Sequence, residues 1–250
     1  MSPPNLFLLP GLLEDAGGFH QVIDALRDIA SCTVADLTQS DTIAGMATDA
    51  LRQAPEGPLL LAGHSMGGYV ALEIARQAPE RLAKLALLNT NARADSPESI
   101  ENRRRLMAMA DRDFDGVVNT LLPKLMTEEH LQDPVRTGII GSMKMAIGKE
   151  AFKRQETAIM ARVDSRPHLA AIRCPTLVIA GRKDAVMPVE LLEELARGIP
   201  GARLEILEDC GHMAAIEKPA EVTRLLREWI TGRAQPADEG STQSLPKGLA

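Results

Sequence analysis

Apolar and amphipathic stretches alternate over residues 1–90. Short apolar runs predict four strands, at residues 6–9, 32–37, 59–62 and 82–89. Apolar side chains that recur at helical spacing predict three helices, over residues 19–29, 41–53 and 67–77. Asp41 is the expected N-cap of the second helix. Because strands and helices follow one another through short connections, we expect an α/β fold whose mostly parallel sheet carries helices on both faces.

The alternation stops between residues 91 and 170, which show helical patterns and no convincing strand. The expected helices cover residues 97–110, 113–126 (broken by Pro123), 134–147 and 149–163, and a further helical region opens at residues 127–129. Strand and helix patterns then resume, at residues 176–180, 189–197, 203–207 and 220–230. We therefore expect an α/β core of residues 1–90 and 171–232, with residues 91–170 inserted as a helical cap, or lid.

The composition changes after Gly232, where Gln, Pro, Asp, Gly, Ser and Thr predominate. A segment of this kind cannot bury enough apolar surface to offset the entropy lost on ordering. We therefore expect residues 233–250 to form a disordered tail.

The apolar run 59–62 leads directly into Gly63-His64-Ser65-Met66-Gly67-Gly68. Gly-x-Ser-x-Gly between a strand and a helix is the pattern of a nucleophile elbow, which holds a serine at the apex of a sharp turn. The free N–H groups and the positive dipole end of the following helix would face the hydroxyl of Ser65. The motif alone also fits an ordinary glycine-rich turn, so its interpretation depends on finding partners for Ser65.

A serine hydroxyl is a weak nucleophile at neutral pH and needs an oriented base, usually a histidine. His212 is the best candidate among five histidines, because it lies just past the last predicted strand. A loop at the carboxyl end of a strand is where an open α/β sheet binds its ligand. His64 is adjacent to Ser65, but we expect its side chain to point away from the hydroxyl.

The acid that orients the histidine should also follow a strand. Asp184 directly follows the predicted strand 176–180. Asp95 and Asp209 lie near other strand ends and are the weaker alternatives. The resulting chain order of Ser65, Asp184 and His212 is the order associated with the α/β-hydrolase arrangement.

Two backbone N–H groups should stabilise the oxyanion that forms during acyl transfer. Met66, directly after the serine, is expected to supply one, and Leu12, in the loop after the first strand, the other. The cap is rich in methionine, which suits either helix packing or an adaptable apolar pocket. The residues expected to line the substrate pocket are Leu13, Met126, Met143, Met187 and Met213.

Charge and cysteine usage narrow the classes of partner. The net charge is −6, whereas nucleic-acid binders are usually basic, so we expect no nucleic-acid partner. Three cysteines without CxxC spacing argue against a disulfide framework and a zinc site, and we expect no metal. Without a basic signal segment or a long apolar run, we expect a cytoplasmic protein that does not bind membranes. We also expect a monomer or homodimer.

These features together resemble the α/β-hydrolase superfamily. The resemblance rests on Leu9-Pro10-Gly11, the elbow at residues 63–68, the segment 174–184 and Gly211-His212-Met213. The chain is most similar to the small capped group of carboxylesterases, enol-lactonases and C–C hydrolases. The resemblance implies a trimmed sheet of about six strands, with the cap between the family's sixth and seventh strands. Pro10-Gly11 departs from the His-Gly pair that many members carry in the oxyanion loop.

The resemblance also implies a mechanism that agrees with the residues. Ser65 would attack an acyl carbon with His212 as base, Asp184 would orient the histidine, and water would release the acyl group, without metal or organic cofactor. We expect a carboxylic ester hydrolase acting on a small-molecule ester or lactone with a small to medium apolar acyl group. The alternatives are a thioesterase or C–C bond hydrolase of the same fold and, from another class, a ligand receptor that does not turn over.

Overall fold

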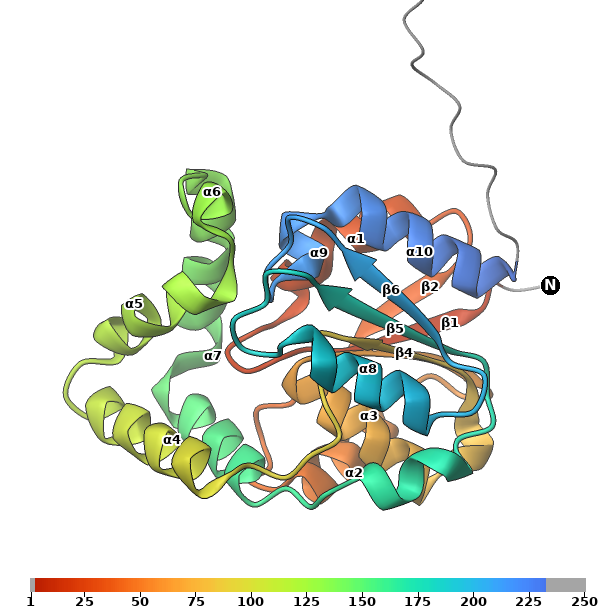
Figure 1. The fold of residues 1–250 in the computed structure, drawn as a ribbon, viewed down its shortest axis with the longest axis horizontal. Coiled ribbons are helices and arrows are strands. Elements are labelled where there is room, and N and C mark those ends of the chain that lie inside the picture. The colour runs from red at the N-terminus through yellow and green to blue at the C-terminus, as the bar shows by residue number, and fades with distance from the viewer. Residues whose placement is uncertain (1–2, 233–250) are drawn as a thin grey trace, which may run out of the picture.

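A single six-stranded sheet forms the centre of the molecule. The computed structural model describes residues 3–232, and all six strands run parallel in the order β2-β1-β3-β4-β5-β6 (Figure 1). The strands are β1 (Asn5–Leu9), β2 (Ser31–Val34), β3 (Leu59–His64), β4 (Leu82–Leu88), β5 (Thr176–Gly181) and β6 (Arg203–Leu207). The predicted fold class, a parallel α/β sheet of about six strands, is therefore confirmed.

Helices cover both faces of the sheet, which is why the central strands are apolar on both sides. Every residue of β3 and β5 is buried. One face packs against α2 (Ile43–Gln53), α3 (Met66–Gln77) and α8 (Val189–Gly198). The other face packs against α1 (His20–Leu26), α9 (Ala214–Glu217) and α10 (Pro219–Thr231), which lie above the sheet in Figure 1.

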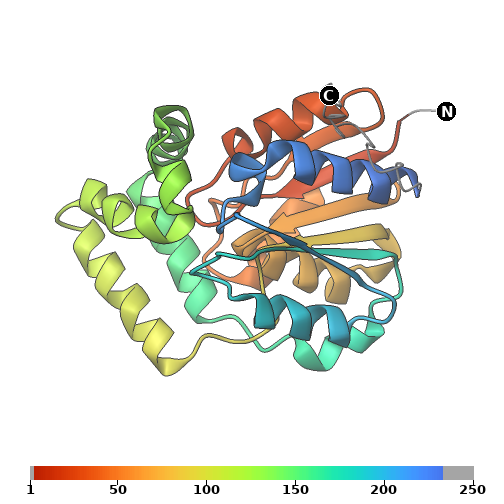
Figure 2. The ribbon, with the colours of Figure 1, turned by 45° about the horizontal axis from the view of Figure 1, so that its top comes forward.

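The chain between β4 and β5 is helical, as predicted. It forms α4 (Pro97–Ala110), α5 (Phe114–Leu125), α6 (Glu128–Leu131) and α7 (Pro134–Met160). These helices share their own apolar cluster and lie beyond the ends of the strand arrows in Figures 1 and 2. Gly148 interrupts α7 with φ 75° and ψ 168°, at the break predicted between residues 147 and 149. No helix among residues 3–232 is long and apolar enough to cross a membrane.

Several element ends differ from the sequence prediction. Thr42, not Asp41, caps α2, because its side chain accepts the N–H of Gly45 at 3.0 Å. Strand β2 ends at Val34 rather than at residue 37. Four short elements were not predicted, because each is too short to carry a periodic pattern: α9, η1 (Ala16–Phe19), η2 (Pro79–Arg81) and η3 (Arg166–Ala171). The predicted tail, residues 233–250, lies outside the described residues.

Strand register brings five loops to one edge of the sheet. The last residue of β1, Leu9, pairs with Gly63, while His64 at the end of β3 pairs with Leu88. In the same way Gly181 pairs with Leu207. The loops after β1, β3, β4, β5 and β6 therefore leave the carboxyl edge together.

Candidate active site

Ser65 occupies a strained turn between β3 and α3. Its backbone has φ 51° and ψ −115°, a conformation that costs a non-glycine residue on the order of 1–3 kcal/mol. The turn is tight because β3 ends at His64 and α3 begins at Met66. A Cβ atom on Gly67 would overlap the carbonyl oxygen of Leu9, and one on Gly63 would overlap the backbone of Gly67. The glycines of the elbow thus allow a close backbone approach that no side chain permits.

Gly67→Ala is therefore expected to lower the free energy of unfolding by about 3 kcal/mol, because the methyl group forces the elbow and β1 apart. Urea denaturation measures this. Gly141→Ala is the matched control: Gly141 lies in α7 with open space around its Cβ position, so alanine there should stabilise by about 0.5–1 kcal/mol. A Gly67→Ala protein as stable as the parent would contradict the close approach.

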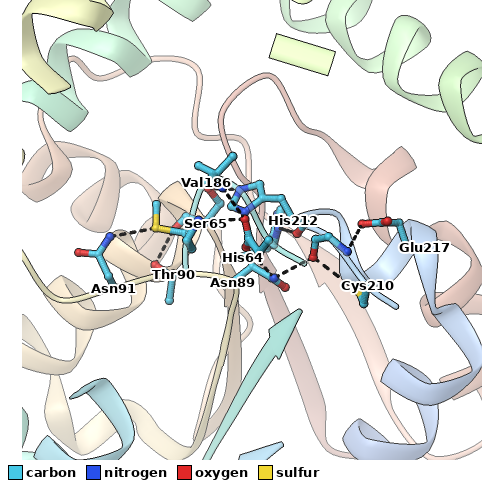
Figure 3. A network of polar contacts seen from close by, with 12 residues as sticks. His64, Ser65, Asn89, Thr90, Asn91, Val186, Cys210, His212 and Glu217 are labelled. Atoms are coloured by element: carbon cyan, nitrogen blue, oxygen red, sulfur yellow. Dashed lines mark hydrogen bonds and ion pairs between the residues drawn. The ribbon is translucent and has the colours of Figure 1, made fainter. Parts of the chain in front are cut away.

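The structure brings together the three side chains that the sequence singled out. Ser65 Oγ lies 2.9 Å from His212 Nε2 (both residues are labelled in Figure 3), and His212 Nδ1 lies 2.8 Å from Asp184 Oδ2. Their exposed fractions are only 9%, 3% and 6% for Ser65, His212 and Asp184. Because a carboxylate only accepts, Nδ1 carries the imidazole proton and Nε2 is left to accept from the hydroxyl of Ser65.

Asp184 is held as a carboxylate by several donors. The N–H groups of Val186 and Met187 donate to its Oδ1, both at 2.8 Å, and Asn89 Nδ2 donates to Oδ2 at 2.9 Å. Burial alone would raise the pKa of Asp184. The charge and hydrogen bond of His212, together with the bonds from Met187 and Asn89, lower it by more, so the net pKa lies below its ordinary value. Asn89 was not identified from the sequence; its place directly after β4 was the only available signal.

The loop that carries His212 is fixed by the inserted helices. The N–H groups of His212 and Met213 both donate to the carbonyl of Leu125, at 3.0 and 3.1 Å. The buried carboxylate of Glu217 accepts the N–H of Gly211 at 3.0 Å and that of Thr127 at 2.9 Å (Figure 3 labels Glu217). The position of the histidine therefore depends on contacts with the segment between α5 and α6, which the sequence did not reveal.

The backbone N–H groups of two residues near Ser65 have no protein acceptor among residues 3–232. Met66 is the first residue of α3, so its N–H lies outside the helical hydrogen-bond ladder. In the loop after β1, Gly11 N–H donates to Glu14 and Leu13 N–H donates to Gln155, at 2.5 and 3.1 Å. Within residues 3–232 no acceptor contacts the N–H of Leu12 or Met66. These are the two donors that the sequence prediction assigned to an oxyanion.

A cavity of about 440 Å³ opens beside Ser65 and His212. Four of the predicted pocket residues contribute to its wall, namely Leu13, Met143, Met187 and Met213. The inserted helices add further apolar side chains, including Leu106, Val118, Leu121 and Ile140. Apolar side chains from the loops and from the inserted helices thus form much of the cavity wall.

Met126 differs from the prediction. It is only 4% exposed and is not part of the cavity wall. Its side chain packs in the apolar cluster of the inserted helices, and its main chain lies against Gly211. The neighbouring Leu125 lines the cavity instead.

The cavity wall also includes charged side chains that pair among themselves. Asp95 contacts Arg103 Nε at 2.6 Å and Arg162 Nη1 at 2.5 Å, and Arg103 Nη1 contacts Glu156 at 2.7 Å. Each guanidinium therefore already faces a carboxyl group. Asp95 is consequently not available to His212, and the other alternative acid, Asp209, is exposed and paired with Lys183 at 2.6 Å. Among residues 3–232, no group of three His, Cys, Asp or Glu side chains is arranged to hold a metal ion.

The family model described as the alpha/beta hydrolase family matches residues 6–225 of the chain. The chain belongs to the alpha/beta hydrolase family. A curated relative, the pimeloyl-[acyl-carrier protein] methyl ester esterase of Nitrosomonas europaea, is 27% identical over 232 residues, which cover 87% of this chain and 92% of that protein.

Two solved structures agree with this family. A thermophilic esterase from Thermogutta terrifontis has a TM-score of 0.85 and 30% identity, covering 94% of this chain and 92% of its own. The enol-lactonase from Burkholderia xenovorans LB400 has a TM-score of 0.84 and 26% identity, covering 92% of both chains. The resemblance seen in the sequence is confirmed, and this alpha/beta hydrolase is a hydrolytic enzyme.

Proposed function

We propose that this alpha/beta hydrolase is a serine hydrolase that cleaves carboxylic esters or lactones with a small to medium apolar acyl group. The observation that carries the proposal is the contact of Ser65 with His212 and of His212 with Asp184, at the wall of a largely apolar cavity. The ester and lactone activities in the names of similar proteins point the same way.

The proposed reaction proceeds through an acyl-enzyme. Ser65 attacks the carbonyl carbon while His212 Nε2 takes its proton, and Asp184 stabilises the imidazolium that results. The N–H groups of Leu12 and Met66 donate to the oxyanion; each such donor contributes on the order of 3 kcal/mol in acyl transfer. His212 then protonates the leaving alcohol. A water molecule, activated by the same histidine, releases the acid and restores Ser65.

We further propose that helices α4–α7 act as a cap over Ser65. They supply apolar side chains to the cavity wall, and the carbonyl of Leu125 holds the loop of His212. Arg103 and Arg162 already face carboxyl groups, so neither guanidinium is free to pair with an anionic substrate. Neutral esters and lactones fit these conditions.

A substrate panel with a serine-directed probe tests the proposal. The purified protein is expected to hydrolyse p-nitrophenyl esters of short and medium acyl chains, and a fluorophosphonate should inactivate it by adding to Ser65. Peptide mass spectrometry locates the adduct. Lactones, acyl-CoA thioesters and vinylogous diketones extend the panel: turnover of only the thioester or the diketone would replace the ester assignment with that activity. Tight binding of a panel member without turnover would instead favour a receptor.

A further inference from the structure

A second carboxylate–imidazole pair lies beneath Ser65, outside the contacts used in the proposed reaction. Glu14 Oε2 lies 2.7 Å from His64 Nδ1, and each side chain is 3% exposed. The other ring nitrogen, His64 Nε2, lies 2.9 Å from the carbonyl oxygen of His212. The rings of His64 and His212 are 5.0 Å apart, centre to centre. His64 thus points away from the hydroxyl of Ser65, as the sequence suggested, and contacts the histidine loop.

The proton positions in this pair follow from its partners. A carbonyl oxygen only accepts, so His64 Nε2 must carry a proton. Glu14 Oε2 also accepts the N–H of Gly11 at 2.5 Å, which suits a carboxylate. Burial lowers the pKa of His64, but the Glu14 carboxylate raises it more, and the net pKa is raised. An imidazolium that donates from both nitrogens satisfies every contact.

The pair joins two parts of the site that are far apart in sequence. Glu14 Oε2 holds Gly11, whose peptide bond to Leu12 carries the proposed oxyanion donor. His64 holds the main chain of His212. A Cβ atom on Gly11 would lie 2.9 Å from Glu14 Oε2, 3.1 Å from His64 Nδ1 and 3.3 Å from Ser65 Cβ. The oxyanion loop, the nucleophile and the pair are therefore in direct contact.

A buried ion pair is a poor way to stabilise a fold. Desolvating both charges offsets much of their attraction, and apolar side chains of similar volume are often as stable or more so. The pair instead orients the backbone, because its hydrogen bonds to Gly11 and to the carbonyl of His212 each fix one loop relative to Ser65.

We propose that Glu14 and His64 are positioning residues that hold the oxyanion loop and the His212 loop in register with Ser65. This inference rests on the proposed function, because the proposed reaction is what gives Leu12 and His212 their roles.

Glu14→Gln tests the proposal because no placement of the amide keeps every contact. If the amide oxygen takes the place of Oε2 and accepts from Gly11, no negative charge faces His64 and the ring becomes neutral. A neutral ring carries only one N–H, so it can donate either to the amide oxygen or to the carbonyl of His212, but not to both. With its nitrogen toward His64, the amide loses Gly11. We expect kcat for a p-nitrophenyl ester to fall about 10–100-fold while KM changes by less than about threefold. The rate constant of fluorophosphonate inactivation should fall by a similar factor.

Glu228→Gln is the matched control. Glu228 is also buried, 5% exposed, and pairs with Arg203 and Arg224, but it does not line the cavity. Its loss should lower Tm and leave kcat unchanged. If Glu14→Gln lowers Tm alone, with parental kcat and inactivation rate, the positioning role is overturned.

His64→Gln decides the matter if Glu14→Gln does not fold, since it breaks the same link from the other side and should show the same loss in kcat. Failure of both variants to fold would make the pair structural and overturn the proposal. Ser65→Ala separates the two proposals: ester hydrolysis that survives it removes the proposed function itself. If Ser65→Ala loses ester hydrolysis while Glu14→Gln and His64→Gln keep the parental turnover, only the positioning role is overturned.

Discussion

Ser65→Ala is expected to reduce kcat for ester hydrolysis by about 10⁴–10⁶-fold, leaving only the rate that binding and the oxyanion donors can support. The variant keeps His212 and Asp184 but has no atom that can form the acyl-enzyme. Its fold should be unchanged or slightly more stable, because alanine removes a buried hydroxyl. Initial rates at saturating p-nitrophenyl ester measure the loss, and the fluorophosphonate adduct on residue 65 should disappear with it.

Ser99→Ala is the matched control for this loss. Ser99 lines the same cavity, yet among the hydrogen bonds of residues 3–232 its hydroxyl contacts only Ser96, at 3.0 Å, and not His212. Its kcat should stay within about twofold of the parent, since it removes no interaction specific to the transition state. Equal losses in Ser65→Ala and Ser99→Ala would indicate disruption of the cavity rather than removal of a nucleophile. Full activity in Ser65→Ala would place the chemistry on another residue.

The residues around Ser65 differ in how far the sequence predicts them. The elbow is predictable because a strand, a Gly-x-Ser-x-Gly turn and a helix form one local pattern. Asp184 and His212 are predictable because parallel strands deliver their following loops to the same edge, so that residue type and strand order suffice. Both arguments need only the order of elements along the chain.

Contacts between distant segments are different. Asn89, Glu217 and Gln155 each hold a loop of the site through one hydrogen bond or a few. A single polar side chain has no periodicity. The partner of Asn89 lies 95 residues away and that of Gln155 lies 142 residues away. Glu217 and Gly211 are separated by a short helix that no pattern predicts. Glu14 and His64 belong to the same class. These residues emerge only once the strands are in register.

The apolar wall of the cavity shows a related difference. Helical spacing identifies which positions of α4–α7 are apolar, but the inserted helices bury apolar side chains both against one another and toward Ser65. Met143 and Met126 are both buried, with exposed fractions of 3% and 4%, although of the two only Met143 lines the cavity. Periodicity predicts which face of a helix is apolar. Whether a side chain on that face packs in the apolar cluster or lines the cavity depends on how the helices cross.

Asp184→Asn is expected to lower kcat by about 10⁴-fold while preserving the fold. Oδ1 of Asp184 accepts the N–H groups of Val186 and Met187, so the oxygen of the new amide stays on that side. Its NH₂ group then replaces Oδ2 and donates to His212 Nδ1. The imidazole proton is thereby moved to Nε2, where it faces Ser65 and cannot accept the hydroxyl proton. Asn89 Oδ1, which has no hydrogen-bond partner among residues 3–232, can accept the remaining amide N–H if the Asn89 amide turns, although this gives up the 3.2 Å bond from Asn89 Nδ2 to the carbonyl of Gly211.

The pH dependence of the free energy of unfolding tests the same substitution independently of turnover. The folded protein holds the pKa of Asp184 below its ordinary value of 3.8. The carboxylate therefore contributes stability at pH values above 3.8, and this contribution is lost as the pH falls through the lowered pKa. The difference in unfolding free energy between the parent and Asp184→Asn should therefore shrink as the pH falls below the ordinary carboxyl value of 3.8. Urea titrations at a series of pH values measure it.

Asp209→Asn is the control that separates Asp184 from the other acid near His212. Asp209 is exposed and paired with Lys183, and it has no contact with the imidazole among the hydrogen bonds of residues 3–232. Its kcat should therefore equal that of the parent. Parental turnover in Asp184→Asn together with a large loss in Asp209→Asn would assign the orienting acid to Asp209. Loss of kcat in Asp184→Asn alone, in a variant that remains folded under the assay conditions, requires that Asp184 act on the protonation of His212 rather than on the fold.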